Sequence, residues 1–294
     1  MTHQAVTETP WTATDVTGTT ITLSAPAQRI ICMASPGIDM LLSLGMEPLA
    51  ILKDGGAETA AHPRFFGDRV EQFPRIGGAF FTPNLDDVRA LKPDLIIAWA
   101  GDQASVRESL PDIPIFYTYT VRVSDAIRDL QSLGILTEQT SEADAAIARF
   151  ETRVKDVQAH IAKRIKTAVL LDGSDELELM TEQTLLGNVL SLISEYPFPL
   201  PEGGMHFGGC ILCSFDDIVQ HDPDVLFTIT ATWVERSTPL NERLANDPQW
   251  SELWAIKNHR MHEVPATWAS TGGLQGVTVV LDEILPLIYP DMAV

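Results

Sequence analysis

The stretch Leu91-Lys-Pro-Asp-Leu-Ile-Ile97 recurs in outline as His221-Asp-Pro-Asp-Val-Leu-Phe227, about 130 residues further along the chain. In each copy a short acidic helix ends before Pro-Asp, because proline disfavours a helical conformation in the residue that precedes it. A buried apolar strand follows. One such unit repeated at this distance predicts two similar α/β lobes and argues against a solenoid of short repeats.

The segments around both copies alternate between short apolar runs and runs with helical apolar spacing. Apolar runs bounded by turn residues predict buried strands, and periodic runs that start at a capping residue predict helices. We expect strands at Arg29–Met33, Pro48–Leu52, Leu95–Trp99, Ile113–Tyr117, Thr167–Leu171 and Val225–Ile229. We expect helices at Ile38–Leu44, Asn84–Leu91, Leu185–Ile193, Asp216–Gln220 and Val277–Ile288.

The segment from Ser141 to Lys166 has no proline or glycine, and its apolar residues recur at helical spacing. A helix of this length spans about 39 Å, more than one small lobe, so we expect a rigid connector. The expected domains are an N-terminal α/β lobe at 1–139, a connecting helix at 140–166 and a C-terminal α/β lobe at 167–294. The predicted fold class is α/β: two Rossmann-like lobes with central sheets, joined by one long rigid helix. A ligand cleft is expected between them, beyond the carboxyl ends of the strands.

The composition limits the classes of function. The 294 residues include 40 acidic and 20 basic side chains, a formal net charge of −20, which argues against nucleic acid as a partner. The densest basic run, Lys163-Arg-Ile-Lys166, fits the C-terminal end of the long helix. No apolar run of about 18 residues predicts a membrane-spanning helix. The N-terminus, Met1 to Trp11, is polar and has no apolar signal-peptide region, so the chain is either cytoplasmic or the mature part of a secreted protein with Met1 added.

Motifs spread over about 260 residues resemble those of the substrate-binding proteins of ABC importers for iron–siderophore complexes, haem and cobalamin. They are Gln28-Arg-Ile-Ile-Cys-Met-Ala-Ser-Pro36, Asn84-Leu-Asp-Asp-Val-Arg-Ala-Leu-Lys-Pro-Asp-Leu-Ile-Ile97, Leu186-Gly187-Asn-Val-Leu190, Ser214-Phe-Asp-Asp-Ile-Val-Gln-His-Asp-Pro-Asp224, Asp247-Pro-Gln-Trp250 and Ile284-Leu-Pro-Leu-Ile-Tyr-Pro290. Each motif alone is weak, but their order and spacing along the chain make the resemblance specific.

This resemblance implies an extracytoplasmic solute-binding protein. Its native form could be a lipoprotein. Such a protein is not an enzyme and has neither catalytic residues nor an intrinsic cofactor or metal. It would act as a monomer that captures a metal chelate and delivers it to an ABC transporter permease in the membrane. A ferric siderophore is the expected cargo, and cobalamin and haem are the alternatives.

The resemblance also implies a carboxylate on each lobe that docks onto arginines of the permease. By position these residues are Asp86 and Asp216, where the family usually has glutamate, so the reach of the side chain is shorter here. The alternative interpretation is that both are helix N-terminal charges, worth a few tenths to about 1 kcal/mol each.

Aromatic and cationic residues near the strand ends are the candidates for the ligand cleft. The expected ligand-binding residues are Phe81, Trp99, His206, Trp233, Arg236 and Trp268. Arginine suits anionic chelates because its guanidinium offers a planar fork of donors. Structural alternatives stay open: packing inside a lobe for Trp99, a surface ion pair with Glu235 or Glu242 for Arg236, and simple solvation for His206.

The three cysteines include the pair Cys210-Ile-Leu-Cys213. Four interpretations of this pair are open. A local disulfide or two buried thiols are favoured over half of a zinc or iron–sulfur site and over a thioredoxin-like redox pair. The rival hypothesis of a different class is a metal- or redox-active protein that uses this pair together with His206.

The net charge also constrains the cargo. The field of a chain with charge −20 opposes an anionic chelate. Either a cluster of arginines at the cleft overrides that field locally, or the cargo is neutral or cationic.

Overall fold

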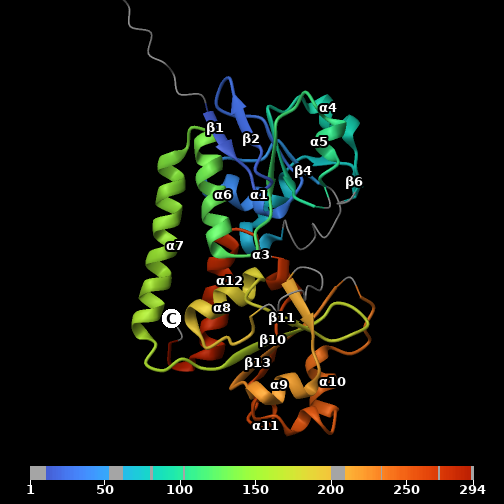
Figure 1. The fold of residues 1–294 in the computed structure, drawn as a ribbon, viewed down its shortest axis with the longest axis vertical. Helices are drawn as coiled ribbons and strands as arrows, with labels where there is room; N and C mark the ends of the chain where they lie inside the picture. The colour runs from blue at the N-terminus through green and yellow to red at the C-terminus, as the bar shows by residue number, and fades with distance from the viewer. Residues whose placement is uncertain are drawn as a thin grey trace, which may run out of the picture. The chain divides into compact units, whose positions relative to one another are not determined.

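The structure is a computed structural model that describes residues 11–52, 62–79, 82–101, 103–199, 209–232, 234–270 and 272–292. The chain divides into two compact units (Figure 1). Unit 1 comprises Met1–Tyr119 and Ile127–Ile147, and unit 2 comprises Thr120–Ala126 and Ala148–Val294. Each unit has its own five-stranded sheet, which confirms the prediction of two α/β lobes with central sheets.

The sheet of unit 1 is parallel throughout, in the strand order β5-β4-β3-β8-β9. Apolar residues fill it almost completely, as expected for a parallel sheet covered on both faces. The strands are β3 (Ile30–Cys32), β4 (Ala50–Leu52), β5 (Arg75–Ile76), β8 (Leu95–Trp99) and β9 (Ile115–Thr118). The helices are α1 (Ser35–Ser43), α3 (Pro63–Phe66), α4 (Leu85–Leu91) and α5 (Val106–Ser109), with the short 3-10 helix η1 (Asp68–Gln72).

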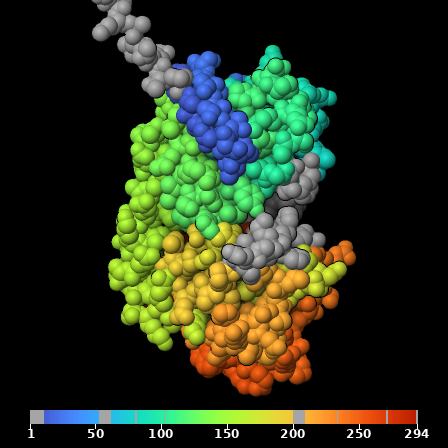
Figure 2. All heavy atoms as spheres, in the orientation of Figure 1, coloured from blue at the N-terminus to red at the C-terminus, as the bar shows by residue number. Residues whose placement is uncertain are grey.

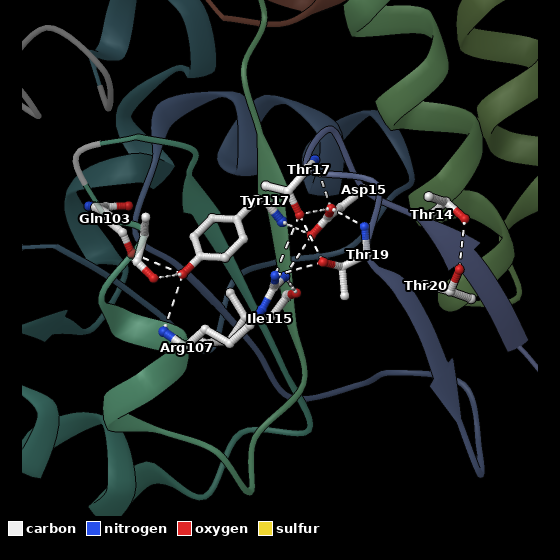
Figure 3. A network of polar contacts seen from close by, with 10 residues as sticks. Thr14, Asp15, Thr17, Thr19, Thr20, Gln103, Arg107, Ile115 and Tyr117 are labelled. Carbon is white, nitrogen blue, oxygen red and sulfur yellow. Dashed lines mark hydrogen bonds and ion pairs between the residues drawn. The ribbon is translucent and has the colours of Figure 1, made fainter.

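Two small antiparallel hairpins belong to the same unit. The first joins β1 (Trp11–Thr14) to β2 (Thr20–Leu23), and the second joins β6 (Gly78–Ala79) to β7 (Thr82–Pro83). In Figure 2 the first hairpin, in blue, lies on the surface of unit 1. Buried contacts at its turn, shown in Figure 3, tie it to β9.

The sheet of unit 2 is mixed, in the order β12-β11-β10-β13-β14. Strands β10, β13 and β14 run parallel to one another, whereas β11 runs antiparallel to both of its neighbours, β10 and β12, so the sheet differs from an all-parallel Rossmann-like sheet. The strands are β10 (Thr167–Asp172), β11 (Glu178–Met180), β12 (Cys210–Leu212), β13 (Val225–Thr230) and β14 (Met261–Glu263). The helices are α8 (Leu185–Ile193), α9 (Phe215–His221), α10 (Leu240–Asn246), α11 (Trp254–Lys257) and α12 (Leu274–Ile288), with 3-10 helices η3 (Trp250–Glu252), η4 (Ala266–Ser270) and η5 (Pro290–Met292).

The repeated Pro-Asp motif has the same structure in both units. Helices α4 and α9 end at Lys92 and Asp222, which have left-handed φ values of 48° and 43°. The aspartate after each proline accepts a hydrogen bond from the backbone next to the neighbouring strand. Asp94 accepts hydrogen bonds from the backbone N–H of Arg29 just before β3, and Asp224 accepts one from Lys166 just before β10. The aspartate of each motif therefore satisfies a backbone donor just before the central strand of its sheet, which explains why proline is followed by aspartate in both copies.

Two further helices have residues in both units: α6 (Val123–Leu136) and α7 (Thr140–His160). The long helix predicted from the sequence is confirmed at its start, but its expected end at Lys166 is wrong. Arg164 donates to the carbonyl oxygens of Ser191 and Ser194, and the Lys166 backbone leads directly into β10. These contacts hold the basic run in an extended path after the helix. The role of α7 as a rigid connector stays a prediction.

Candidate functional site

A pair of arginines surrounds one buried carboxylate at the carboxyl end of the sheet of unit 2. Asp172 is the last residue of β10, and its side chain is 5% exposed. Arg236 donates from Nε to both Asp172 oxygens at 3.0 and 3.2 Å, and Arg243 pairs with the same carboxylate through Nη2. The hydrogen bond and charge of Asp172 raise the pKa of Arg236. One carboxylate therefore holds both guanidiniums in place.

Local structure fixes each partner of this pair. Arg236 lies in the loop after β13 and also donates from Nη2 to the carbonyl oxygen of Ser174. Arg243 lies on α10, whose first residue, Leu240, donates its backbone N–H to the side chain of Thr230 at the end of β13. The carboxyl ends of β10 and β13 thus place both arginines, since these strands are parallel neighbours.

The arginine pair opens onto a pocket of about 370 Å³. Three leucines form its apolar part, and four charged side chains form the rest. The lining residues are Asp172, Asp175, Leu177, Arg236, Leu240, Arg243 and Leu244. Most of the lining side chains are charged, so the pocket suits a ligand with polar groups. We call this site the arginine pocket.

Arg236 was predicted as a ligand-binding residue, with an ion pair to Glu235 or Glu242 as the alternative. In the structure its ionic partner is Asp172, which is 64 residues away in sequence. Arg243 was not predicted, although it lies seven residues after Arg236 on a short helix with apolar spacing. Its role becomes visible only when β10 and β13 are placed side by side.

In unit 1, Trp99 closes β8 and forms an aromatic pair with Tyr119, with ring centroids 5.1 Å apart. The buried side chain of Gln103 accepts the Trp99 backbone N–H at 2.7 Å and donates to the carbonyl oxygen of Met33 at 3.1 Å. One side chain therefore links the carboxyl ends of β8 and β3. Trp99 is half-buried, and its contact with a ligand stays a prediction.

Trp268 is 2% exposed, and its indole N–H donates to Glu283 at 2.7 Å. Its ring lies 6.4 Å from that of Phe227, so in this structure it packs inside unit 2 and offers almost no surface to a ligand. The ligand contact predicted for Trp268 stays untested. Phe81, His206 and Trp233 lie outside the described residues.

The helices that carry the two predicted docking residues match position by position. Asn84 caps α4 and Ser214 caps α9 through side-chain hydrogen bonds, and Asp86 and Asp216 are the second residues of the two helices. Both are exposed, Asp86 to 90%.

The acidic residues that follow the docking candidates are used internally. Asp87 accepts the backbone N–H of Gly77 at 2.8 Å, and Asp217 forms a capping box with Ser214. The preceding carboxylates, Asp86 and Asp216, take no part in these two contacts. Asp86 also pairs with Arg89 of its own helix at 2.8 Å.

The two cysteines of the C-x-x-C pair lie on extended backbone. Cys210 begins β12, and the ladder continues to Cys213, whose N–H donates to the carbonyl oxygen of Leu177. Three residues of extended chain span about 10 Å, beyond the Cα separation of about 4.4–6.8 Å that a disulfide needs. The local disulfide is therefore excluded, and both residues are free thiols.

These thiols are also poorly suited to redox chemistry or metal binding. Burial, and secondarily the charge of Glu178, raises the pKa of Cys210 to about 12. Burial, with Asp217 adding to it, raises the pKa of Cys213 to about 12. Both stay protonated at neutral pH, whereas nucleophiles and metal ligands are thiolates. Within the described ranges, no group of three or more His, Cys, Asp or Glu side chains could hold a metal ion.

Among the helices described, none is long and apolar enough to cross a membrane.

Comparisons with known proteins agree with this geometry. The model of the periplasmic binding protein family matches residues 41–267. The chain is 25% identical to a probable siderophore-binding lipoprotein, YfiY, of Bacillus subtilis, over 91% of this chain and 84% of that protein. It is 26% identical to the Fe(3+) dicitrate-binding periplasmic protein FecB of Escherichia coli, over 87% of this chain and 83% of that protein.

Among solved structures, Staphylococcus aureus SirA complexed with staphyloferrin B has a similar fold, with a TM-score of 0.77 at 18% identity over 94% of this chain and 97% of that chain. The family model covers the arginine pocket, the sheet of unit 2 and the sheet of unit 1 apart from its strand β3. The resemblance predicted from the sequence motifs is confirmed, and the chain belongs to the periplasmic binding protein family.

Proposed function

We propose that this protein is an extracytoplasmic solute-binding protein that captures a ferric siderophore and delivers it to an ABC transporter permease. The observation that carries the proposal is the arginine pocket, two guanidiniums fixed by buried Asp172 at the carboxyl end of a sheet in a member of a binding-protein family. The protein acts as a monomer, performs no chemistry on its cargo and in its native form is anchored as a lipoprotein.

The arginine pocket can hold a chelate through its remaining donors. In the part of the chain that the structure describes, Arg236 Nη1 and the Nε and Nη1 atoms of Arg243 donate to no protein acceptor. Arg243 is also the more exposed of the two, at 41% against 25%. Paired N–H donors of this kind match the oxygens of carboxylate, hydroxamate or catecholate groups. Leu240 and Leu244 supply apolar contact beside them.

The names of relatives support iron over the other cargoes. YfiY is described as siderophore-binding and FecB as binding ferric dicitrate, and neither description mentions haem or cobalamin. Cobalamin and haem are therefore the less favoured members of the same class. The metal- or redox-active alternative is not favoured, because the family is one of binding proteins and the thiols of Cys210 and Cys213 stay protonated.

Titration of the intrinsic tryptophan fluorescence with a panel of ferric siderophores, haemin and cobalamin tests the proposal. We expect at least one ferric siderophore to bind with a Kd below about 1 μM, which corresponds to about −8 kcal/mol. If nothing in the panel binds at that level, or if only haemin or cobalamin does, the ferric-siderophore assignment fails.

Replacing Arg243 with alanine is expected to weaken binding of that siderophore about 10- to 100-fold. Hydrogen bonds to a charged group contribute about 1.5–3 kcal/mol, and two donor atoms of Arg243 have no acceptor among the described residues. Arg149→Ala is the matched control, because it removes the same charge from an exposed position in unit 2 that does not line the pocket. If Arg243→Ala binds the siderophore as tightly as the wild type does, the arginine pocket is not part of the binding site.

We also propose that Asp86 and Asp216 dock onto basic residues of the permease. The double variant Asp86→Asn/Asp216→Asn is expected to bind the siderophore normally but to lower the initial rate of its uptake by cells at least about tenfold, because asparagine cannot form an ion pair. Asp112→Asn/Asp156→Asn, a change at two exposed aspartates elsewhere, is the control. Unchanged uptake with a small loss of stability would support the alternative of helix N-terminal charges.

A further inference from the structure

We infer that the arginine pocket selects ferric chelates of low net charge and discriminates against polyanionic ones. The inference rests on the proposed function and narrows its substrate class. It follows from the charges that line the pocket, from the burial of one of them and from the charge of the whole chain.

Two carboxylates cancel the two guanidiniums of the pocket. The charged lining residues are two cations, Arg236 and Arg243, and two anions, Asp172 and Asp175, so their formal charges sum to zero. Asp172 is nearly buried and in direct contact with both arginines. Asp175 is exposed, and its charge acts on Arg236 from the pocket wall. The pocket therefore offers oriented donors without a net positive charge.

The rest of the molecule does not supply the missing charge. The chain carries 40 acidic and 20 basic side chains, a formal net charge of −20. A neutral pocket leaves this negative field uncompensated, and a highly charged anionic chelate has to enter against it. A single oxygen pair of a neutral chelate still gains the directional hydrogen bonds of the guanidiniums.

The apolar lining acts in the same direction. Leu177, Leu240 and Leu244 form the uncharged part of the wall. A carboxylate that faces these side chains loses hydration without gaining a partner, which costs more for each additional charge of the ligand. Of the two options left by the sequence, an arginine cluster that overrides the field or a cargo of low charge, the pocket corresponds to the second.

Binding of two probes at two salt concentrations tests this inference. Ferrichrome is a neutral ferric tris-hydroxamate, and ferric dicitrate is a polyanion. We expect the wild-type protein to bind ferrichrome at least about tenfold more tightly. We expect its affinity for ferric dicitrate to rise when salt is increased from about 0.05 to about 0.5 M, because salt screens repulsion. An anion-attracting pocket shows the opposite sign of salt dependence.

Asp175→Asn removes one carboxylate without touching the Asp172 contacts. It is expected to shift the ratio of the dicitrate and ferrichrome affinities about three- to tenfold toward dicitrate, a small effect because solvent and salt screen the charge of the exposed Asp175. The control Glu176→Gln neutralises the next residue, which is exposed and does not line the pocket, and is expected to leave the ratio within about twofold.

Three results would overturn the inference and leave the proposed function intact: tighter binding of dicitrate by the wild type, dicitrate affinity that falls with salt, or equal shifts in the two variants. Failure of every ferric chelate to bind would overturn the proposed function itself, and this inference with it. A circular dichroism spectrum of the same sample separates that outcome from an unfolded preparation.

Discussion

Replacing Asp15 with alanine is expected to lower the free energy of unfolding of unit 1 by about 3 kcal/mol. The Asp15 side chain is fully buried in the turn between β1 and β2. It accepts the backbone N–H groups of Thr17, Thr19 and Tyr117 at 2.9, 3.1 and 3.2 Å, and Nη2 of Arg107 at 2.7 Å. Alanine leaves these donors without their acceptor, and the cost of a buried unsatisfied group exceeds the net gain from an ordinary hydrogen bond.

The network extends well beyond this carboxylate (Figure 3). The Arg107 guanidinium lies over the Tyr117 ring, 4.4 Å from its centroid, and the Tyr117 hydroxyl donates to the carbonyl oxygen of Gln103 at 3.0 Å. Gln103 in turn holds the backbone of Trp99. The hairpin, β9 and the loop after β8 therefore share one set of polar contacts. We expect the loss of Asp15 to disturb the backbone position of Trp99 as well.

Urea denaturation followed by circular dichroism measures this effect. Thr14→Ala is the matched control in the same hairpin, because Thr14 makes an exposed hydroxyl contact with Thr20 at 3.2 Å, and its loss is expected to cost less than about 0.5 kcal/mol. If Asp15→Ala unfolds at the same urea concentration as Thr14→Ala, the buried network does not stabilise the unit as described.

Local sequence patterns were sufficient for much of the fold. The predicted strand at Leu95–Trp99 and the predicted helix at Leu185–Ile193 have the same bounds in the structure. Both carry strong local signals, an uninterrupted apolar run in the first case and helical apolar spacing in the second. Strands β11 and β12 were not predicted, whereas the equally short β3 and β4 were, because β3 and β4 lie within longer apolar runs bounded by turn residues.

The site was less predictable because its contacts are distant in sequence. Arg236 is a candidate from its place after a strand, but its partner Asp172 lies on another strand, and the contact depends on the parallel pairing of β10 with β13. The position of Arg243 depends on how α10 is anchored to Thr230. The burial of Trp268 was also not predictable from residue type and loop position, because it depends on tertiary packing; its ligand contact stays a prediction.

Replacing Gly187 with alanine is expected to lower the free energy of unfolding by about 3 kcal/mol or more. Gly187 lies in the first turn of α8, within the Leu186-Gly187 motif of the family resemblance. A Cβ atom at this position would overlap the carbonyl oxygen of Thr181 and lie 2.8 Å from its carbonyl carbon. These are backbone atoms, so a rotamer change cannot relieve the overlap.

The atoms that Gly187→Ala would displace are themselves needed. The Thr181 carbonyl accepts the backbone N–H and the hydroxyl of Thr184 at 3.0 and 2.8 Å, and the same hydroxyl caps α8 by accepting the Gly187 N–H at 3.0 Å. Moving Thr181 therefore breaks the helix cap as well, and a lost cap adds about 1 kcal/mol. The variant therefore has two costs, the steric clash and the lost helix cap, and their sum exceeds either cost alone.

Gly45→Ala is the control that separates this clash from the general cost of replacing glycine. Gly45 has a φ of +72° after α1, and an added Cβ there would meet no atom within 4 Å. Its expected cost is about 1 kcal/mol, because only the left-handed backbone opposes alanine. If both variants unfold at the same urea concentration, close packing against Thr181 is not the reason for the glycine. A Gly187→Ala midpoint well below that of Gly45→Ala, with wild-type circular dichroism in the folded state, is the result that the packing of α8 requires.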